Sequence, residues 1–307
     1  MSKKLRIVFF GTPDFAAASL QKLIENKVNV VAIVTAPDRP RGRGKKLGTS
    51  AVKDYAIKVC LPILQPSNLK SPDFIEELKS LQADLQIVVA FRMLPVIVWD
   101  LPALGTINLH ASLLPQYRGA APINWVIING EKETGVTTFF LKHEIDTGEI
   151  IFQNSEPIYN NDNAGTLYRR LMHKGADLVL KTVHAIQLGE YPRIPQKSTE
   201  KLVTAPKIFK EDCKIDWNRP AEKVRNFIRG LSPYPGAWTS FNGKILKIFD
   251  VDLSGLEGKE PGKYSVRSAG EELMISCQDH QLEITELQQE GKKRMSSDEF
   301  LRGHTFQ

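Results

Sequence analysis

The segment Gly105-Thr-Ile-Asn-Leu-His110-Ala-Ser-Leu-Leu-Pro115 decides how the rest of the chain is interpreted. Its first half alternates, so Ile107 and Leu109 point to one face of a strand and Asn108 and His110 point to the other. A carboxamide and an imidazole therefore emerge side by side where the strand ends. Open α/β sheets bind their ligands outside the carboxyl ends of the strands. The pair consequently predicts a functional site at this end of the strand.

The chain before this strand alternates between apolar strands and helices. Residues 5–10 and 28–34 are predicted strands on either side of a helix that begins near Pro13, and residues 85–90 form a further buried strand. Such β-α-β units predict an α/β fold with a doubly wound, mostly parallel sheet. The turn at 11–15 lacks the GxGxxG spacing of dinucleotide-binding folds, which disfavours a nicotinamide cofactor.

The length of 307 residues predicts two domains. We expect a Rossmann-like catalytic domain over 1–190, which the helical periodicity of 164–188 would complete. Residues 191–206 are punctuated by proline and are predicted to be a linker. Residues 207–307 contain short alternating runs separated by glycine, which favour a C-terminal OB-like β-barrel.

Composition sets limits on the class of protein. Hydrophobic residues make up 42% and charged residues 25% of the chain, as is typical of soluble globular proteins. The three cysteines are scattered and show no metal-ligand spacing, so we expect reduced thiols and no metal. Neither a signal peptide nor an apolar run of membrane length is evident. We therefore expect a cytoplasmic monomer without a membrane partner.

Positive charge is concentrated in two regions, residues 197–250 and the glycine- and proline-rich segment 36–50. The composition of segment 36–50 argues against helix or strand and predicts a long exposed loop, a kind of segment that is often functional. A solvated basic surface would explain the charge alone, but a polyanion such as RNA would also gather it. The candidate RNA-binding side chains in this loop are Arg39, Arg41, Arg43, Lys45 and Lys46.

Asn108, His110 and Asp146 form a plausible set for acyl transfer. An acyl group that moves to an amine passes through a tetrahedral intermediate, whose oxyanion an amide N–H or a protonated imidazole stabilises. Imidazole can also carry the proton of the amine, and a nearby carboxylate can orient it. The chain has no GxSxG nucleophile elbow, so direct transfer is favoured over an acyl-enzyme. Taken alone, Asp146 would be interpreted as an Asx-turn residue.

At this point the chain resembles a known family, the folate-dependent formyltransferases. Further segments are similar to the branch of that family that acts on charged initiator tRNA, including its C-terminal domain. The family motifs are Asn108-Leu-His110, Ser112-Leu-Leu-Pro115, Arg118-Gly-Ala-Ala-Pro122 and Asp146-Thr-Gly148. The segments that narrow the resemblance are 11–15, 37–40, 42–46, 215–217 and 233–238.

The resemblance implies a reaction and a role for each motif. The formyl group of 10-formyltetrahydrofolate would pass to the α-amine of methionyl initiator tRNA, for translation initiation. Asn108 and His110 would lie at the formyl oxygen, and Asp146 would hold His110 and relay protons. Arg43 would contact the acceptor end of the tRNA. The C-terminal barrel would bind more of the tRNA through the basic residues near it, Lys207, Lys210, Lys214, Arg225 and Arg229. The residues implied to bind folate are Phe91, Arg92, Met93 and Leu94 in one loop and Ser112, Leu113, Leu114 and Pro115 in another.

Two other functions remain open at this point. A formyltransferase that acts on the amine of a sugar nucleotide would share the trio but would not need the basic loop. A non-catalytic tRNA-binding protein would need the basic loop but would not need Asn108, His110 and Asp146 together. Formyl transfer to charged initiator tRNA, compared with transfer to a sugar amine, separates these possibilities.

Overall fold

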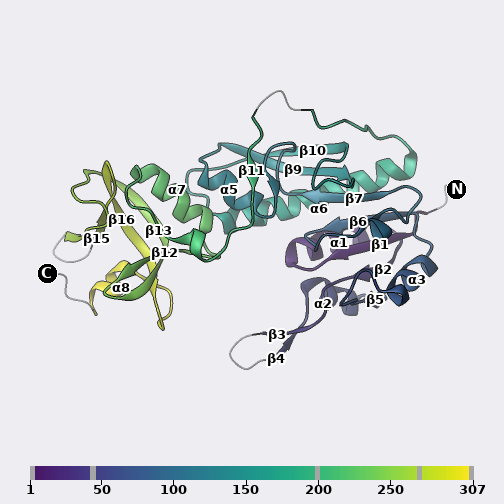
Figure 1. The fold of residues 1–307 in the computed structure, drawn as a ribbon, viewed down its shortest axis with the longest axis horizontal. Helices are drawn as coiled ribbons and strands as arrows, with labels where there is room; N and C mark the ends of the chain where they lie inside the picture. Colours follow the sequence, from purple (N-terminus) through teal and green to yellow (C-terminus); the bar gives the residue numbers. More distant parts are fainter. Residues whose placement is uncertain (1–3, 42–45, 198–200, 268–271, 304–307) are drawn as a thin grey trace. The chain divides into compact units, whose positions relative to one another are not determined.

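In the computed structural model the chain forms two compact units (Figure 1). The structure describes residues 4–41, 46–197, 201–267 and 272–303. Unit 1 comprises 1–118, 135–156 and 169–204, and unit 2 comprises 119–134, 157–168 and 205–307. Each unit therefore consists of three separate segments of the chain, whereas the sequence predicts domains that are each one continuous segment. The functional division into 1–190, 191–206 and 207–307 stays a prediction.

Within the described residues, the sheet of unit 1 has the strand order β10-β9-β7-β6-β1-β2-β5. Strands β1, β2, β5, β6 and β7 run parallel to one another, and β9 runs antiparallel to β7. The prediction of an α/β fold with a mostly parallel sheet is thus confirmed. The strands are β1 (Ile7–Gly11), β2 (Val30–Val34), β5 (Ile63–Leu64), β6 (Leu85–Val89), β7 (Thr106–His110), β9 (Glu133–Phe140) and β10 (Ile150–Pro157).

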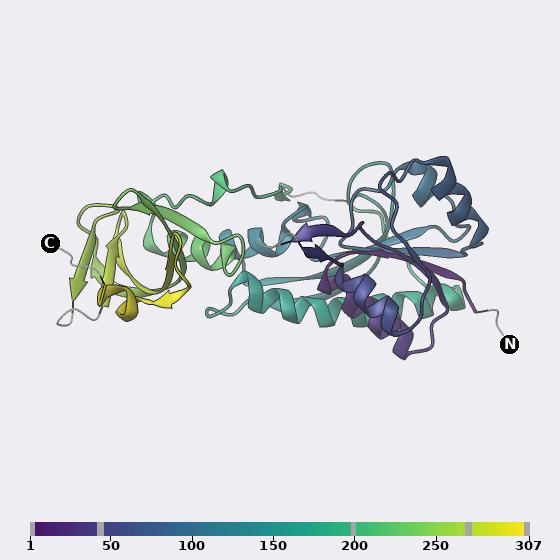
Figure 2. The same cartoon turned by 90° about the horizontal axis from the view of Figure 1, so that it is seen from below.

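Helices pack on both faces of this sheet, and Figure 2 shows α3 on one side and α6 on the other. One face carries Val8, Phe10 and Val88, which form a buried cluster with apolar side chains of α3 and α4. The opposite face carries Leu109, and a Cβ built on Gly175 of α6 would lie 2.8 Å from its Cδ2 atom. The helices are α1 (Asp14–Glu25), α2 (Ala51–Lys58), α3 (Pro72–Ser80), α4 (Val96–Trp99) and α6 (Ala164–Leu188).

The basic segment 36–50 contains a β-hairpin, so the prediction that it holds no strand was wrong. Strands β3 (Arg39–Arg41) and β4 (Lys46–Gly48) pair antiparallel in a two-stranded sheet of their own. Glycine and proline disfavour the interior of a large sheet, but a short isolated pair tolerates proline because both of its strands are edges.

Unit 2 is built around an antiparallel sheet of the order β12-β13-β16-β15-β14, with β17 on β16. Helix α7 packs against α5 and β13 around a core that contains Ile228, Leu246 and Ile284. Residues 215–217 lie outside the strands of this sheet: Lys214 forms an isolated parallel bridge with Trp238, and the Ile215 N–H donates to the Trp238 carbonyl at 2.8 Å. The elements are α5 (Pro122–Ile128), α7 (Ala221–Leu231), β12 (Ala237–Phe241), β13 (Lys244–Glu257), β14 (Tyr264–Arg267), β15 (Glu272–Ser276), β16 (His280–Gln289), β17 (Met295–Ser296) and α8 (Ser297–Leu301).

Short elements connect these parts of the chain. Strand β8 (Arg118–Gly119) pairs with β11 (Thr204–Ala205), and a 3-10 helix spans Glu211–Cys213. Across the described ranges, every helix is too short or too polar to cross a lipid bilayer.

Candidate active site

Strand β7 places Asn108 and His110 on one face at its carboxyl end. Asn108 lies opposite Val88 of the parallel strand β6, so both side chains point to the face that packs on α3 and α4. The loop that follows β6 therefore emerges beside the end of β7. Asn108 is half-buried, and in the described part of the chain no hydrogen bond engages its carboxamide. Its N–H and C=O groups are thus open to a ligand.

The His110 imidazole is buried, and each of its two nitrogens faces an oxygen atom. Its Nε2 atom lies 2.8 Å from the carbonyl oxygen of Tyr117. A carbonyl oxygen only accepts, so Nε2 carries a proton and donates it. The Nδ1 atom lies 3.8 Å from Oδ2 of Asp146. Nδ1 is consequently the nitrogen that can take up or release a proton during a reaction.

Asp146 belongs to a tight turn between β9 and β10. Its φ angle is +55°, a left-handed conformation that aspartate tolerates better than most residues. Gly148 is required by close packing, because a Cβ at this position would lie 1.5 Å from the carbonyl oxygen of Phe140. The motif Asp146-Thr-Gly148 therefore has a steric basis: only glycine lets the turn lie against β9 and bring the carboxylate to His110.

A glutamine that the sequence prediction missed holds this turn. The Gln196 amide donates to the carbonyl oxygens of Asp146, at 2.9 Å, and of Gly148, at 2.7 Å. Its Oε1 atom accepts from Nε and a terminal nitrogen of Arg118, at 3.2 and 2.7 Å. Gln196 thus links the aspartate turn to the first residue of the Arg118-Gly-Ala-Ala-Pro122 motif.

The segment predicted to be a linker contributes further contacts to unit 1. The backbone of Ile194 exchanges two hydrogen bonds with Ile150, and the N–H of Tyr117 donates to Val203 at 2.7 Å. The second contact fixes the residue whose carbonyl oxygen holds His110. The described part of this segment therefore supports the site, in addition to connecting the chain.

The Ser112–Pro115 loop, predicted to bind folate, is fixed by a network of side chains. The Thr137 hydroxyl donates to the Ser112 carbonyl at 2.6 Å and accepts from the Leu114 N–H at 3.2 Å. The Gln153 amide donates to the Leu114 carbonyl at 2.9 Å. Ser112 and Leu114 are buried, whereas Leu113 and Pro115 are half-buried. The loop is therefore a rigid wall that follows directly on His110.

The second predicted folate loop, Phe91–Leu94, presents a mixed surface. Leu94 is buried in the core, and the Phe91 ring meets Phe10 edge to face at 5.8 Å. Met93 is 73% exposed. Arg92 donates to the carbonyl oxygens of Ser67 and Pro66, so its guanidinium ties this loop to the preceding one. Leu94 and Phe91 thus serve mainly as packing, and Met93 is the side chain that offers an apolar contact to a ligand.

The base of the β3–β4 hairpin is anchored by a polar cluster. Asp38 accepts from Lys53 at 2.6 Å and from Gln65 at 2.9 Å, and these hydrogen bonds lower the pKa of its carboxyl group. Arg39 is exposed; its charge, together with burial as the larger cause, lowers the pKa of Arg92. Arg92 still stays protonated at neutral pH. The two guanidinium groups make this end of unit 1 positive.

The remaining predicted RNA contacts are only partly described. Arg41 and Lys46 pair through their backbones in the hairpin, and Arg43 and Lys45 lie outside the described residues. In unit 2, Arg229 is buried, and it donates to Asn226 and to the carbonyl oxygen of Asp162. Arg229 therefore has a structural role and is unavailable to RNA.

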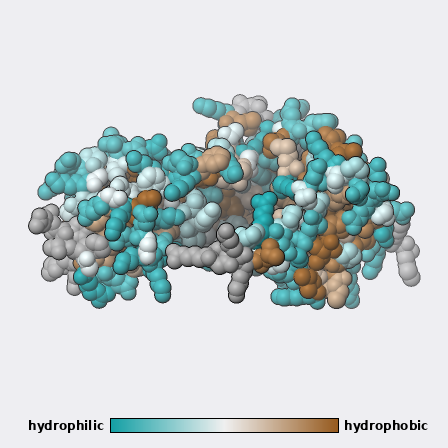
Figure 3. Space-filling model, turned by 60° about the horizontal axis from the view of Figure 1, so that its bottom comes forward, coloured by the Kyte–Doolittle hydropathy of each residue, from teal (hydrophilic) through white to brown (hydrophobic). Residues whose placement is uncertain are grey.

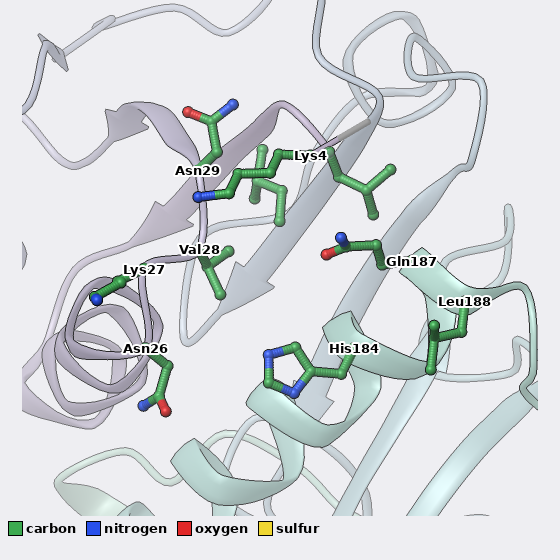
Figure 4. Close-up of a pocket in the computed structure, with 10 residues that line it drawn as sticks. Lys4, Asn26, Lys27, Val28, Asn29, His184, Gln187 and Leu188 are labelled. Atoms are coloured by element: carbon green, nitrogen blue, oxygen red, sulfur yellow. The ribbon is translucent and has the colours of Figure 1, made fainter. Parts of the chain in front are cut away.

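Two other features lie away from the predicted site. A cavity of about 410 Å³ opens at the amino ends of β1 and β2, where Lys4, Lys27 and His184 line it (Figure 4). None of the predicted site residues lines this cavity. Among the described residues, no cluster of three histidine, cysteine or acidic side chains could hold a metal ion.

Comparison with known proteins identifies the family. Residues 5–183 match the model for "Formyl transferase", and residues 207–305 match "Formyl transferase, C-terminal domain". The chain belongs to the formyl transferase family, and it is an enzyme of this class. The predicted resemblance to the formyltransferase family is thereby confirmed.

Curated relatives narrow the identification. Methionyl-tRNA formyltransferase of Bacteroides fragilis is 53% identical over 97% of this chain and 95% of its own length. The enzyme of the same name from Flavobacterium johnsoniae is 48% identical over 99% of this chain and 98% of its own.

Solved structures agree on the fold. An N-formyltransferase from Helicobacter canadensis, in complex with folinic acid and dTDP-3-aminofucose, aligns over 91% of this chain and 98% of its own with a TM-score of 0.67. HypX from Aquifex aeolicus, in complex with tetrahydrofolic acid, aligns over 97% of this chain and 47% of its own with a TM-score of 0.66. Their sequence identities are 22% and 20%, a degree of likeness that describes the fold.

Proposed function

We propose that this protein transfers the formyl group of 10-formyltetrahydrofolate to the α-amine of methionyl initiator tRNA. The observation that carries the proposal is the trio of Asn108, His110 and Asp146, with His110 Nδ1 3.8 Å from the Asp146 carboxylate. Curated relatives named methionyl-tRNA formyltransferase, at about half identity over nearly the full chain, support the choice of substrate.

The reaction is a direct acyl transfer. The neutral amine of methionine attacks the formyl carbon, and a tetrahedral intermediate with an oxyanion forms. The bond between the formyl carbon and the folate nitrogen N10 then breaks. The amine loses one proton and N10 gains one, so the products are formylmethionyl-tRNA and tetrahydrofolate.

The three side chains divide this chemistry. The Asn108 carboxamide, which no described protein group engages, donates an N–H to the developing oxyanion. His110 Nδ1 moves the proton of the amine, because Nε2 is committed to the Tyr117 carbonyl. The Asp146 carboxylate beside Nδ1 keeps the imidazole in position and stabilises the positive charge on it. Catalytic contacts of this kind often shorten once substrate is bound.

The neighbouring loops have matching roles in the proposal. The rigid 112–115 loop and Met93 would line the folate site, since the loop directly follows β7 and Met93 lies in the loop after β6, the strand next to β7. The basic segment 39–48 would contact phosphates near the acceptor end of the tRNA. Arg39 is its described exposed cation.

The proposal is tested with purified protein, 10-formyltetrahydrofolate and methionyl initiator tRNA. We expect formylmethionyl-tRNA to form, and the variants Asn108→Ala and His110→Ala to lose at least about 100-fold in kcat, as for the removal of one oxyanion donor. An amino-sugar nucleotide serves as the control acceptor. Formylation of the sugar amine alone would overturn the choice of substrate, and full activity of both variants would overturn the mechanism.

A further inference from the structure

A turn in unit 2 presents one aromatic ring to solvent. Tyr234 is 82% exposed, the highest fraction of any large hydrophobic side chain in the described residues. The turn is fixed, because the Gly236 N–H donates to the Leu231 carbonyl and Lys247 Nζ donates to the Pro235 carbonyl, both at 2.8 Å. Tyr234 therefore stands on a rigid support, with an ammonium group at the adjacent residue.

Cations and aromatic rings alternate around this turn. A Cβ built on Gly236 would lie 3.3 Å from Lys247 Cδ and 3.1 Å from Phe249 Cε1, so both side chains meet at the turn. The Arg294 guanidinium lies 4.2 Å from the centre of the Phe249 ring. Phe249 therefore lies between the turn that carries Tyr234 and the guanidinium group of Arg294.

Further cations and aromatic rings lie on the other side of Lys247. Trp238 of β12 lies opposite Lys247 of β13, and the Lys214 ammonium is 5.9 Å from the Trp238 ring. We call the whole row the Tyr234 strip. Its members are Lys214, Tyr234, Trp238, Lys247, Phe249 and the basic loop Lys292-Lys293-Arg294.

Three of the five cations in the Tyr234 strip are free to meet a ligand. In the described part of the chain, Lys214, Lys292 and Lys293 form no ion pair, whereas Lys247 donates to the Pro235 carbonyl and Arg294 pairs with Glu286. Hydrophilic residues also dominate the face of unit 2 that is turned to the viewer in Figure 3, while apolar residues gather on unit 1. An exposed ring amid uncommitted cations suits a nucleic acid better than an apolar protein partner.

We propose that the Tyr234 strip binds one unstacked nucleotide of the tRNA substrate, with its base on the Tyr234 ring. The flanking phosphates meet Lys247 and the 292–294 loop. Stacking on an aromatic ring combined with backbone charge neutralisation is how proteins hold single-stranded nucleotides. This inference rests on the proposed function, and it assigns to unit 2 a contact with a looped part of the RNA rather than with its acceptor stem.

The first test compares two RNA substrates in the formylation assay. One is full-length methionyl-tRNA, and the other is a methionyl minihelix that contains only the acceptor stem. We expect Tyr234→Ala to raise KM for full-length tRNA about tenfold, the scale of one lost stacking contact, and to leave the minihelix KM unchanged. Tyr234→Phe should behave as wild type, because the ring is kept. Tyr159→Ala is the matched control, a tyrosine 54% exposed in the same unit.

The second test measures binding of uncharged tRNA without catalysis. Replacing Lys292 and Lys293 together with alanine should reduce the slope of log affinity against log salt by about 1.4 to 1.8, the contribution of two phosphate contacts. Equal losses on tRNA and minihelix, or no loss on either, would overturn the inference. If the wild-type protein formylates neither RNA, the proposed function fails. The binding measurement with Tyr234→Ala still decides whether the strip holds RNA.

Discussion

Replacing Gln196 with alanine should slow the reaction without unfolding the protein. Gln196 touches none of the proposed reacting atoms, but its amide donates to the carbonyl oxygens of Asp146 and Gly148. These two bonds hold a turn in which Asp146 adopts a left-handed conformation. Without them, the carboxylate that faces His110 Nδ1 at 3.8 Å would spend part of its time out of position.

The expected magnitude follows from the bonds that are lost. A neutral hydrogen bond contributes about 1 kcal/mol net, so the loss of two bonds to the turn amounts to about 2 kcal/mol. If this difference appears in the transition state, kcat falls about 30-fold, since about 1.4 kcal/mol corresponds to a factor of ten. KM for folate should change little, because Gln196 does not contact the 112–115 loop.

The assay is single-turnover formyl transfer at saturating substrate, together with thermal unfolding. Gln196→Glu is the informative second variant, because a carboxylate accepts from Arg118 but cannot donate to the turn. It should be impaired in kcat at least as much as Gln196→Ala. Gln187→Ala, a half-buried glutamine on α6 at the other end of the sheet, is the matched control and should keep wild-type kcat.

A double-mutant cycle can refute the reasoning. In an Asp146→Ala background the turn no longer presents a carboxylate, so Gln196→Ala should cost much less than 30-fold there. Fully additive losses would show that Gln196 acts by some route other than Asp146. If folded Gln196→Ala keeps a kcat within threefold of wild type, the turn at Asp146 does not need the Gln196 hydrogen bonds to keep its position.

Three further predictions concern packing and titration. Gly135→Ala should lower the free energy of unfolding by about 1 to 3 kcal/mol, measured by urea denaturation, because the new Cβ would lie 2.4 Å from the Asn154 carbonyl oxygen. Asp38 has a lowered pKa in the folded state, so its contribution to stability is present above pH 3.8 and is lost as the pH falls through the folded pKa. The difference in Tm between wild type and Asp38→Asn should therefore vanish in acid. Burial raises the pKa of Cys277 to about 12, so at pH 8 an alkylating reagent should label the exposed Cys60 and spare Cys277, as mass spectrometry would show.

Local patterns in the sequence were sufficient for the main elements of the site. Alternation in 106–110 predicts a strand with Asn108 and His110 on one face, and the structure has that strand as β7. Strand and helix signals in sequence order predict the mostly parallel sheet. These signals work because side-chain periodicity and chain direction are properties of a few consecutive residues.

The tertiary structure decided what depends on residues far apart in the chain. The proton on His110 Nε2 follows from a carbonyl seven residues away, and Gln196 reaches its partners across 48 to 78 residues. Long-range hydrogen bonds of this kind leave no periodic signal, so a proline-rich stretch was interpreted only as a linker. The pairing of Arg39–Arg41 with Lys46–Gly48 was missed for a related reason: pairing between two short segments depends on how their ends are anchored, and composition does not report this.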